Sequence, residues 1–185
     1  MVCGIDEAGR GPLAGPVCAA AVILPDNFNY GFLNDSKKMT PARRDEARRI
    51  ICAGDSLWGV GWASHLEIDQ LNILQASLLA MKRAFEEMQK KVPSGEDISV
   101  IVDGTFVPDI AVPCIAVVKA DASLREVMAA SILAKTARDR YMDYMDQLYP
   151  QYGYKQHKGY PTKAHRELVL KYGPSPIQRM SFRVS

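Results

Sequence analysis

The chain has 185 residues, of which 48% are hydrophobic, and its formal net charge is +2. This length provides for one hydrophobic core but hardly for two, so we expect a single domain over residues 1–185. No apolar run is long enough to span a membrane, and the first residues lack the pattern of a signal peptide, so we expect a cytoplasmic protein with no membrane partner. The four cysteines occur singly, which excludes a metal or redox motif built from close cysteine pairs.

Five short apolar or β-branched runs are bounded by Gly, Pro, Asp or Asn, as strands are. They cover residues 2–5, 16–24, 57–62, 98–102 and 114–118. The short connection between the first two favours an antiparallel pair, whereas strands separated by helices favour parallel neighbours. The predicted fold class is therefore α/β, with a five-stranded mixed sheet flanked by helices.

Three helices are predicted between and after these strands. The first covers residues 43–52, with Thr40 as its N-cap, proline at the first helical position and Gly54 as its end. In the second, apolar residues recur at steps of three and four from Leu71 to Met88, and we interpret this stripe as core. The third is predicted to run from a cap at Ser123 to about Leu148. The predicted order is β-β-α-β-α-β-β-α.

Acidic residues follow three of the predicted strands. Asp6 and Glu7 come directly after the first strand, Asp103 directly after the fourth, and Asp121 shortly after the fifth. The carboxyl ends of parallel strands meet at one edge of a sheet, where two carboxylates about 4 Å apart would repel by roughly 4 kcal/mol. We therefore expect a cation there, and oxygen ligands without His or Cys favour Mg²⁺ or Mn²⁺ over zinc. Two alternatives are ordinary turn-forming acids and an acid pair that shares a proton.

A glycine-rich loop, AGRGPLAG, covers residues 8–15. Its glycines let the backbone approach a ligand closely. It is not a dinucleotide fingerprint, because a strand follows it, and it lacks the P-loop pattern. A tight hairpin connection is the simpler interpretation, but the position beside Asp6 and Glu7 favours a loop that holds a sugar or phosphate.

The C-terminal part of the chain is basic. Residues 1–118 contain 11 basic and 15 acidic residues, whereas residues 119–185 contain 12 basic and 6 acidic residues. Basic and aromatic residues interleave between residues 152 and 172, a pattern in which lysines contact phosphates and tyrosines stack on bases or sugars. A solvated basic surface with core tyrosines is the alternative. We interpret residues 150–185 as a basic substrate-binding segment and assign no catalytic role to its histidines.

Residues 4–17, GIDEAGRGPLAGPV, resemble the signature of the bacterial-type ribonuclease HII family. The resemblance continues through DSKK at 35–38, NILQAS at 72–77, VDG at 102–104, KAD at 119–121, AASILAK at 129–135, RD at 138–139 and HKGY at 157–160. Ala120 departs from the glycine of many bacterial members. Residues 123–126, SLRE, replace a stretch that more often contains proline.

The resemblance implies a ribonuclease H-like fold with a C-terminal helical substrate-binding segment. The implied activity is hydrolysis of the RNA strand of RNA/DNA hybrids and cleavage 5′ of ribonucleotides embedded in duplex DNA, leaving 3′-hydroxyl and 5′-phosphate ends. Two Mg²⁺ or Mn²⁺ ions would be held by the four catalytic carboxylates of Asp6, Glu7, Asp103 and Asp121.

The resemblance also implies substrate-binding residues. The backbone of Gly9, Arg10 and Gly11 would read the ribose 2′-hydroxyl, Tyr160 would stack at the junction between RNA and DNA, and Ser36, Lys37 and Lys38 would hold phosphates. We expect a monomer with no obligate protein partner. The rival hypotheses are a non-catalytic nucleic-acid-binding module, a DNA nuclease of the same fold, and a sugar hydrolase that uses an acid pair.

Overall fold

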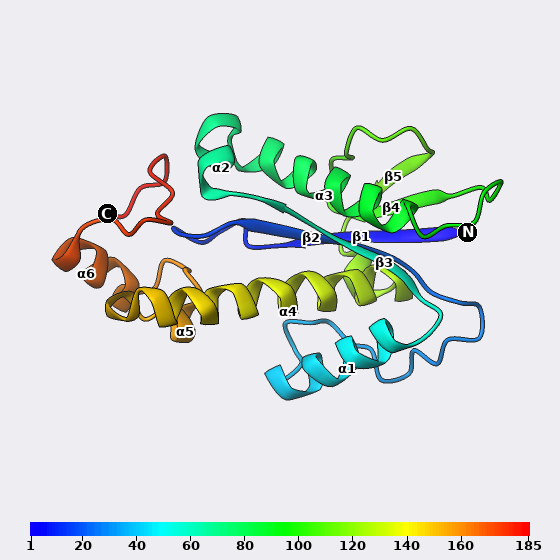
Figure 1. Ribbon diagram of the computed structural model, residues 1–185, viewed down its shortest axis with the longest axis horizontal. Coiled ribbons are helices and arrows are strands. Elements are labelled where there is room, and N and C mark those ends of the chain that lie inside the picture. Colours follow the sequence, from blue (N-terminus) through cyan, green and yellow to red (C-terminus); the bar gives the residue numbers. More distant parts are fainter.

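The computed structural model describes residues 1–185, and its five strands form one mixed sheet (Figure 1). The elements in chain order are β1 Val2–Ala8, β2 Val17–Ile23, α1 Pro41–Ala53, β3 Leu57–Ala63, α2 His65–Leu71, α3 Ile73–Gln89, β4 Ser99–Asp103, β5 Cys114–Val117, η1 Ala120–Ala122, α4 Arg125–Leu148, η2 Pro150–Tyr152, α5 Tyr154–His157 and α6 Lys163–Tyr172. The strand order is β3-β2-β1-β4-β5. The first three of these are antiparallel neighbours, and β4 and β5 continue from β1 in parallel. The predicted α/β class and mixed sheet are confirmed.

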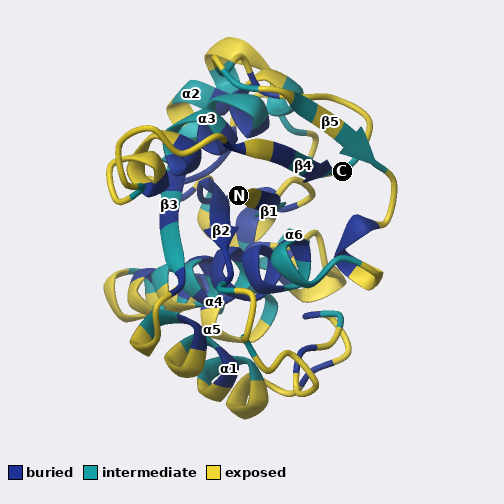
Figure 2. Cartoon of the chain, turned by 90° about the vertical axis from the view of Figure 1, so that its right-hand side faces the viewer, coloured by how far each residue is buried: buried dark blue, intermediate teal, exposed yellow.

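The sheet separates two hydrophobic layers (Figures 1 and 2). Strand β2 is buried along its whole length. Because successive side chains of a strand point to opposite faces, Ala19 and Ala21 pack into the core beneath α3, while Ala20 and Val22 pack into the core beneath α1 and α4. A strand covered on both faces needs a continuous apolar run, which is what the sequence shows here.

Two glycines bring α3 directly onto the backbone of β3. A Cβ atom at Gly59 would overlap the backbone of Met88, and one at Gly61 would overlap that of Ala80. Gly4 does the same for the other layer, because a Cβ there would overlap the backbone of Glu126 in the first turn of α4. These contacts fix where both long helices lie relative to the strands that carry the acidic residues.

The second predicted helix is in fact two helices, α2 and α3, which meet at Asn72. This residue has a positive φ of 77°, and its side chain accepts a hydrogen bond from the Gln75 amide, so it caps α3. Asparagine tolerates a positive φ, and its side chain can replace a helical hydrogen bond by bonding to a nearby backbone amide. Leu71 therefore ends α2, where it is 42% exposed. Its assignment to the core was wrong, whereas Met88 at the other end of the stripe is buried.

The predicted ends are correct for the first helix, whereas the predicted start of the third is wrong. Thr40 caps α1 and accepts a hydrogen bond from the Arg43 amide, and Gly54 ends the helix, as predicted. Ser123 does not cap α4, because the helix begins after Leu124 and has no side-chain cap. The turn of η1 and the close packing of α4 on Gly4 hold this start instead. The C-terminal segment contains the short helices α5 and α6. None of the helices combines the length and apolar composition that a membrane crossing requires.

Candidate metal centre and substrate cavity

Three of the predicted acidic residues meet at one edge of the sheet. Asp6 lies in β1, Asp103 ends the neighbouring strand β4, and Asp121 lies in η1, shortly after β5. One carboxylate oxygen from each lies within 4.8 Å of the others. The parallel pairing of the strands that carry these acids produces this meeting, as expected for the carboxyl ends of strands.

Glu7, the fourth predicted acid, lies beside this cluster and borders the same cavity. One of its carboxylate oxygens, Oε2, is buried and has no hydrogen-bond partner. The other, Oε1, lies 3.9 Å from Nη1 of Arg10. A buried carboxylate oxygen without a donor is costly, so this atom indicates that a ligand belongs here.

The cluster carries more negative charge than the protein neutralises. Burial raises the pKa of Asp6 well above its ordinary value, and the charges of Glu7 and Asp103 raise it further. Burial also raises the pKa of Glu7, against the lowering effect of Arg10, and raises that of Asp103, with the charge of Asp121 adding to it.

The nearest lysine does not balance these charges. Nζ of Lys37 lies 3.9 Å from Oδ2 of Asp121, but the lysine side chain is 78% exposed and contributes little. A cation with several oxygen ligands would remove the repulsion. All the donors are carboxylate oxygens, without His or Cys, so the site fits a hard divalent cation.

A cavity of about 410 Å³ joins the acidic cluster to the glycine-rich loop. The residues that line it are Asp6, Glu7, Ala8, Gly9, Arg10, Gly11, Ser36, Lys37, Asp103, Ser131, Lys135 and Tyr160. Ser36 is buried, and its Oγ shares a hydrogen bond of 2.7 Å with Oγ of Ser131. The cavity therefore gathers three of the four acids and all but one of the predicted substrate-binding residues.

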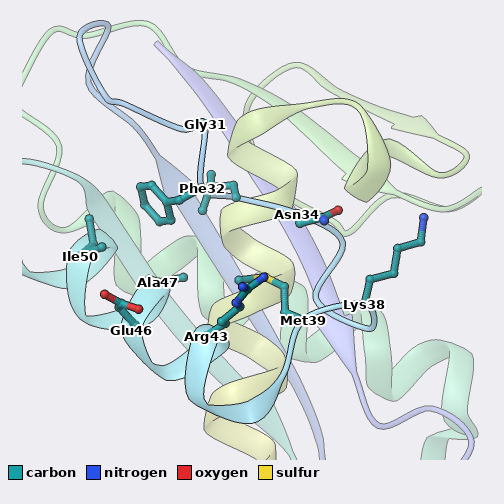
Figure 3. A pocket seen from close by; sticks show the side chains of 10 residues that line it. Gly31, Phe32, Asn34, Lys38, Met39, Arg43, Glu46, Ala47 and Ile50 are labelled. Atoms are coloured by element: carbon teal, nitrogen blue, oxygen red, sulfur yellow. The ribbon is translucent and has the colours of Figure 1, made fainter.

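Lys38 is the predicted residue that lies apart. It lines a different cavity of about 470 Å³, between residues 31–39 and α1 (Figure 3). Residues 35–38 form a turn, in which the Lys38 amide donates to the Asp35 carbonyl and the Lys37 amide donates to Oδ1 of Asp35. This turn sends two consecutive lysines to different cavities.

Gly9 is, with Gly15, one of two positions in the loop whose backbone requires glycine. Its φ is +97°, and a Cβ atom there would overlap the Arg138 side chain. Gly11 faces Tyr160, because a Cβ at that position would lie 3.7 Å from Cε1 of the tyrosine ring. The loop and the tyrosine thus line the same part of the cavity that contains the acidic cluster.

Two histidines hold the backbone around Tyr160. The Tyr160 carbonyl accepts a hydrogen bond from Nδ1 of His165, and the amide of Gly159 donates to Nδ1 of His157. The two imidazole rings are stacked with centroids 4.1 Å apart, and burial is the main cause that lowers the pKa of each. Both rings support the backbone near the cavity, and neither lines it.

Sequence reasoning missed several residues at this site. Ser131 and Lys135 lie one turn apart on α4, so they project from one face of the helix into the cavity. Their i, i+4 spacing was a signal that could have identified them. Arg138, which is buried beneath the loop, stands in the RD motif at 138–139 but was given no role, and Arg179, from the end of the chain, had no local signal beyond its charge.

Comparisons with known proteins agree on one family. The family model described as Ribonuclease HII matches residues 3–185. The ribonuclease HII of Treponema denticola is 54% identical over 195 residues, covering 100% of this chain and 98% of that protein.

Solved structures are similar along the whole chain as well. The ribonuclease H2 of Pyrococcus horikoshii OT3 has a TM-score of 0.75 at 27% identity and covers 99% of this chain and 94% of its own. The RNase HII of Archaeoglobus fulgidus, solved as a complex with PCNA, has a TM-score of 0.74 at 26% identity and covers 96% and 92%.

Proposed function

The chain belongs to the ribonuclease HII family, and we propose which of its residues bind and cut the nucleic acid. It is an endoribonuclease, a metal-dependent phosphodiester hydrolase of the ribonuclease H type, and its family acts on RNA/DNA hybrids. The finer proposal is that it also cuts on the 5′ side of ribonucleotides embedded in duplex DNA. The products would be a 3′-hydroxyl and a 5′-phosphate.

We propose that Asp6, Glu7, Asp103 and Asp121 hold divalent ions, either Mg²⁺ or Mn²⁺. When bound, two such ions would neutralise charge on the scissile phosphate and activate water. The observation that carries this proposal is the meeting of three carboxylates within 4.8 Å, beside the unpartnered Oε2 of Glu7. The Ala120 amide donates to Oδ1 of Asp103 at 2.8 Å, so the protein also orients this carboxylate.

We propose that the backbone of residues 9–11 reads the ribose 2′-hydroxyl, the group that distinguishes RNA from DNA. These residues line the cavity that contains the acidic cluster, and Tyr160, which faces Gly11, lines it too. The tyrosine ring is partly exposed, as stacking at the junction between RNA and DNA requires.

Phosphates of the substrate would be held by basic and hydroxyl side chains that line the same cavity. Lys37 and the Ser36–Ser131 pair lie there, and Lys135 extends toward the Tyr160 ring, with Nζ 5.7 Å from its centroid. Lys38 would act on a different part of the duplex, because it lines the other cavity. We propose residues 150–185 as the basic substrate-binding segment of one domain that spans residues 1–185.

The partner and the location of the protein also stay proposals. PCNA accompanies the Archaeoglobus fulgidus relative in its solved complex, so members of this family can bind another protein. We propose that this chain nevertheless cuts without an obligate partner, as a monomer, and that it acts in the cytoplasm. Activity of the purified chain at its monomeric mass would support the first, and cell fractionation would test the second.

The test is cleavage of an end-labelled DNA duplex that contains one ribonucleotide, with Mg²⁺, with Mn²⁺ and with chelator. An all-DNA duplex of the same sequence is the control. We expect cutting on the 5′ side of the ribonucleotide with either metal, no cutting in chelator, and an intact control.

Other outcomes of this assay identify the rival functions. Binding without cutting under either metal would indicate a non-catalytic binding module. Cutting of the all-DNA control would indicate a DNA nuclease, which has no use for a 2′-hydroxyl reader. Cutting in chelator would exclude the metal-dependent mechanism altogether.

A further inference from the structure

Two buried arginines lie beneath the glycine-rich loop without any acidic partner. Arg138 comes from α4 and Arg179 from the C-terminal segment, and both are almost completely buried. Neither forms a salt bridge, although buried arginines are normally paired. Burial is the main cause that lowers the pKa of Arg179 to about 9, and the charge of Arg138 lowers it further. The fold thus keeps two like charges together beneath this loop.

Arg179 uses all five of its N–H donors on backbone carbonyls of residues 9–16, four in the loop and one directly after it. Nε donates to Gly15 at 2.8 Å, Nη1 to Arg10 at 3.0 Å and Pro12 at 2.8 Å, and Nη2 to Gly9 at 2.6 Å and Pro16 at 3.2 Å. Arg138 holds the carbonyls of Ala14, Pro16 and Lys158. Together the two guanidinium groups hold five carbonyls of the loop, those of Gly9, Arg10, Pro12, Ala14 and Gly15.

Fixing a carbonyl also fixes the N–H of the next residue. The C=O and N–H of a trans peptide point in opposite directions, and the chain has no cis peptide bond. Because the carbonyls of Gly9 and Arg10 point at Arg179, the amides of Arg10 and Gly11 point away from it. No protein group accepts a hydrogen bond from either amide, and both residues line the acidic cavity. Two oriented donors are thus left free beside the cavity.

We propose that Arg179 is a positioning residue for ribose recognition, which aims the amides of Arg10 and Gly11 at the substrate oxygen that they bind. It acts through the loop backbone and touches no reacting atom. The inference rests on the proposed function of residues 9–11 as the reader of the 2′-hydroxyl. Arginine is suited to this task because its planar fork holds several carbonyls in fixed directions, which a lysine ammonium cannot do.

The C-terminal segment is itself fastened to the body of the protein. The Arg179 amide donates to the Leu13 carbonyl, and the Gly15 amide donates to the Ile177 carbonyl. Asp69, in α2, accepts hydrogen bonds from the amides of Met180 and Ser181 at 3.0 Å each. Asp69 does not line the cavity and does not contact the glycine-rich loop. A substitution of Asp69 should therefore loosen the segment that carries Arg179 without changing a residue of the site.

The first experiment compares Arg179→Lys with the intact protein in chelator, where duplex can bind without being cut. We expect the protein to bind a duplex with one ribonucleotide more tightly than the all-DNA duplex. In Arg179→Lys this preference should fall about tenfold, which corresponds to one neutral hydrogen bond between an amide and the hydroxyl. Mn²⁺ binding without nucleic acid, measured by calorimetry, should stay within about twofold because the carboxylates are unchanged.

Amide hydrogen exchange supplies a readout that does not depend on nucleic acid. Exchange of the hydrogen-bonded loop amides of Leu13 and Gly15 should accelerate in Arg179→Lys and, to a smaller extent, in Asp69→Asn. Ile51→Ala is the control for a general loss of stability, because Ile51 is a buried residue of α1 in the other core. It should leave both the loop exchange and the ribonucleotide preference unchanged.

Three results would overturn the inference. In the first, Arg179→Lys keeps both the preference and the slow exchange of the loop. In the second, Ile51→Ala loses the preference to the same extent, so that stability alone explains the effect. In the third, the intact protein shows no preference for the ribonucleotide. This last result would refute the proposed 2′-hydroxyl reader itself, and the exchange data would still show whether Arg179 orders the loop.

Discussion

The acidic cluster and the arginine pair are two groups of buried like charges on opposite sides of one loop, but the fold treats them differently. Arg179 finds an acceptor for each of its N–H groups among backbone carbonyls. In the acidic cluster, Asp6 accepts a hydrogen bond from the Glu7 amide, while Oε2 of Glu7 has no partner. The basic region is thus satisfied from within, and the acidic region is not.

Because of this difference, only the acidic region of the site depends on a bound ligand for its stability. Loop carbonyls are not tied up in a sheet ladder, so a guanidinium can collect several of them and hold the loop ready before substrate arrives. Backbone amides near the acids are too few to satisfy four carboxylates, so that region depends on an external cation. A preorganised reader beside a cation-dependent centre is an arrangement suited to electrostatic catalysis.

The largest effect is expected from removing one charge on the acidic side. Asp103→Asn should lower turnover by at least about 10³-fold, because the variant loses a charged metal ligand while keeping the shape of the side chain. Cleavage of the single-ribonucleotide duplex and the unfolding temperature are the measurements. Asp109→Asn is the matched control, since Asp109 has a 99% exposed side chain between β4 and β5. A folded and fully active Asp103→Asn would remove this residue from the mechanism.

On the basic side, the tight fit of the loop over Arg138 can be tested through Gly9. Gly9→Ala should lower the free energy of unfolding by about 2 kcal/mol or more, because it combines backbone strain with an overlap on Arg138. Gly95→Ala is the control, because Gly95 has a similar φ of +88° but open space around it. Urea unfolding measures both variants. Equal losses would show that the overlap contributes nothing.

A smaller change should weaken recognition at the RNA–DNA junction without removing a charged group. Tyr160→Ala should reduce the discrimination at the junction between RNA and DNA about tenfold, because alanine cannot stack. Tyr160→Phe should retain it, and Tyr144→Ala, which alters an exposed tyrosine of α4, should behave like the intact protein. The measurement is the map of cleavage positions on a duplex with an RNA–DNA junction. Unchanged selectivity in Tyr160→Ala would count against stacking.

The smallest expected effect is a gain in stability. Because the pKa of Asp6 is raised in the folded protein, its ionised form destabilises the metal-free fold above that pKa. Asp6→Asn should therefore raise the free energy of unfolding in chelator at pH 8 by on the order of 1 kcal/mol. The gain should shrink as the pH falls through the raised pKa, where Asp6 takes up a proton. Urea unfolding of both proteins from pH 8 to 5 measures the difference. A loss of stability in Asp6→Asn at pH 8 would contradict the claim that the ionised Asp6 carboxylate destabilises the metal-free fold.

Local patterns predicted much of the fold and the identity of the acids. The alternation and punctuation of apolar residues located five strands, and Thr40 and Gly54 marked the ends of α1. The same patterns failed at Asn72 and Ser123. Asn72 divides a continuous apolar stripe through its own backbone conformation, and the start of α4 depends on packing against β1 rather than on a cap.

The sequence by itself determined the five strands, the acids near their carboxyl ends and the family, because strand periodicity and motifs are encoded by neighbouring residues; it ended the first strand at residue 5, whereas β1 continues through Asp6 and Glu7 to Ala8. Only the tertiary structure decided that Lys37 and Lys38 reach different cavities and that Arg179 lies beneath the loop. Arg179 binds carbonyls more than 160 positions away in the chain. No local pattern specifies such contacts, because they arise when the packed sheet and helices bring the C-terminal segment against the loop.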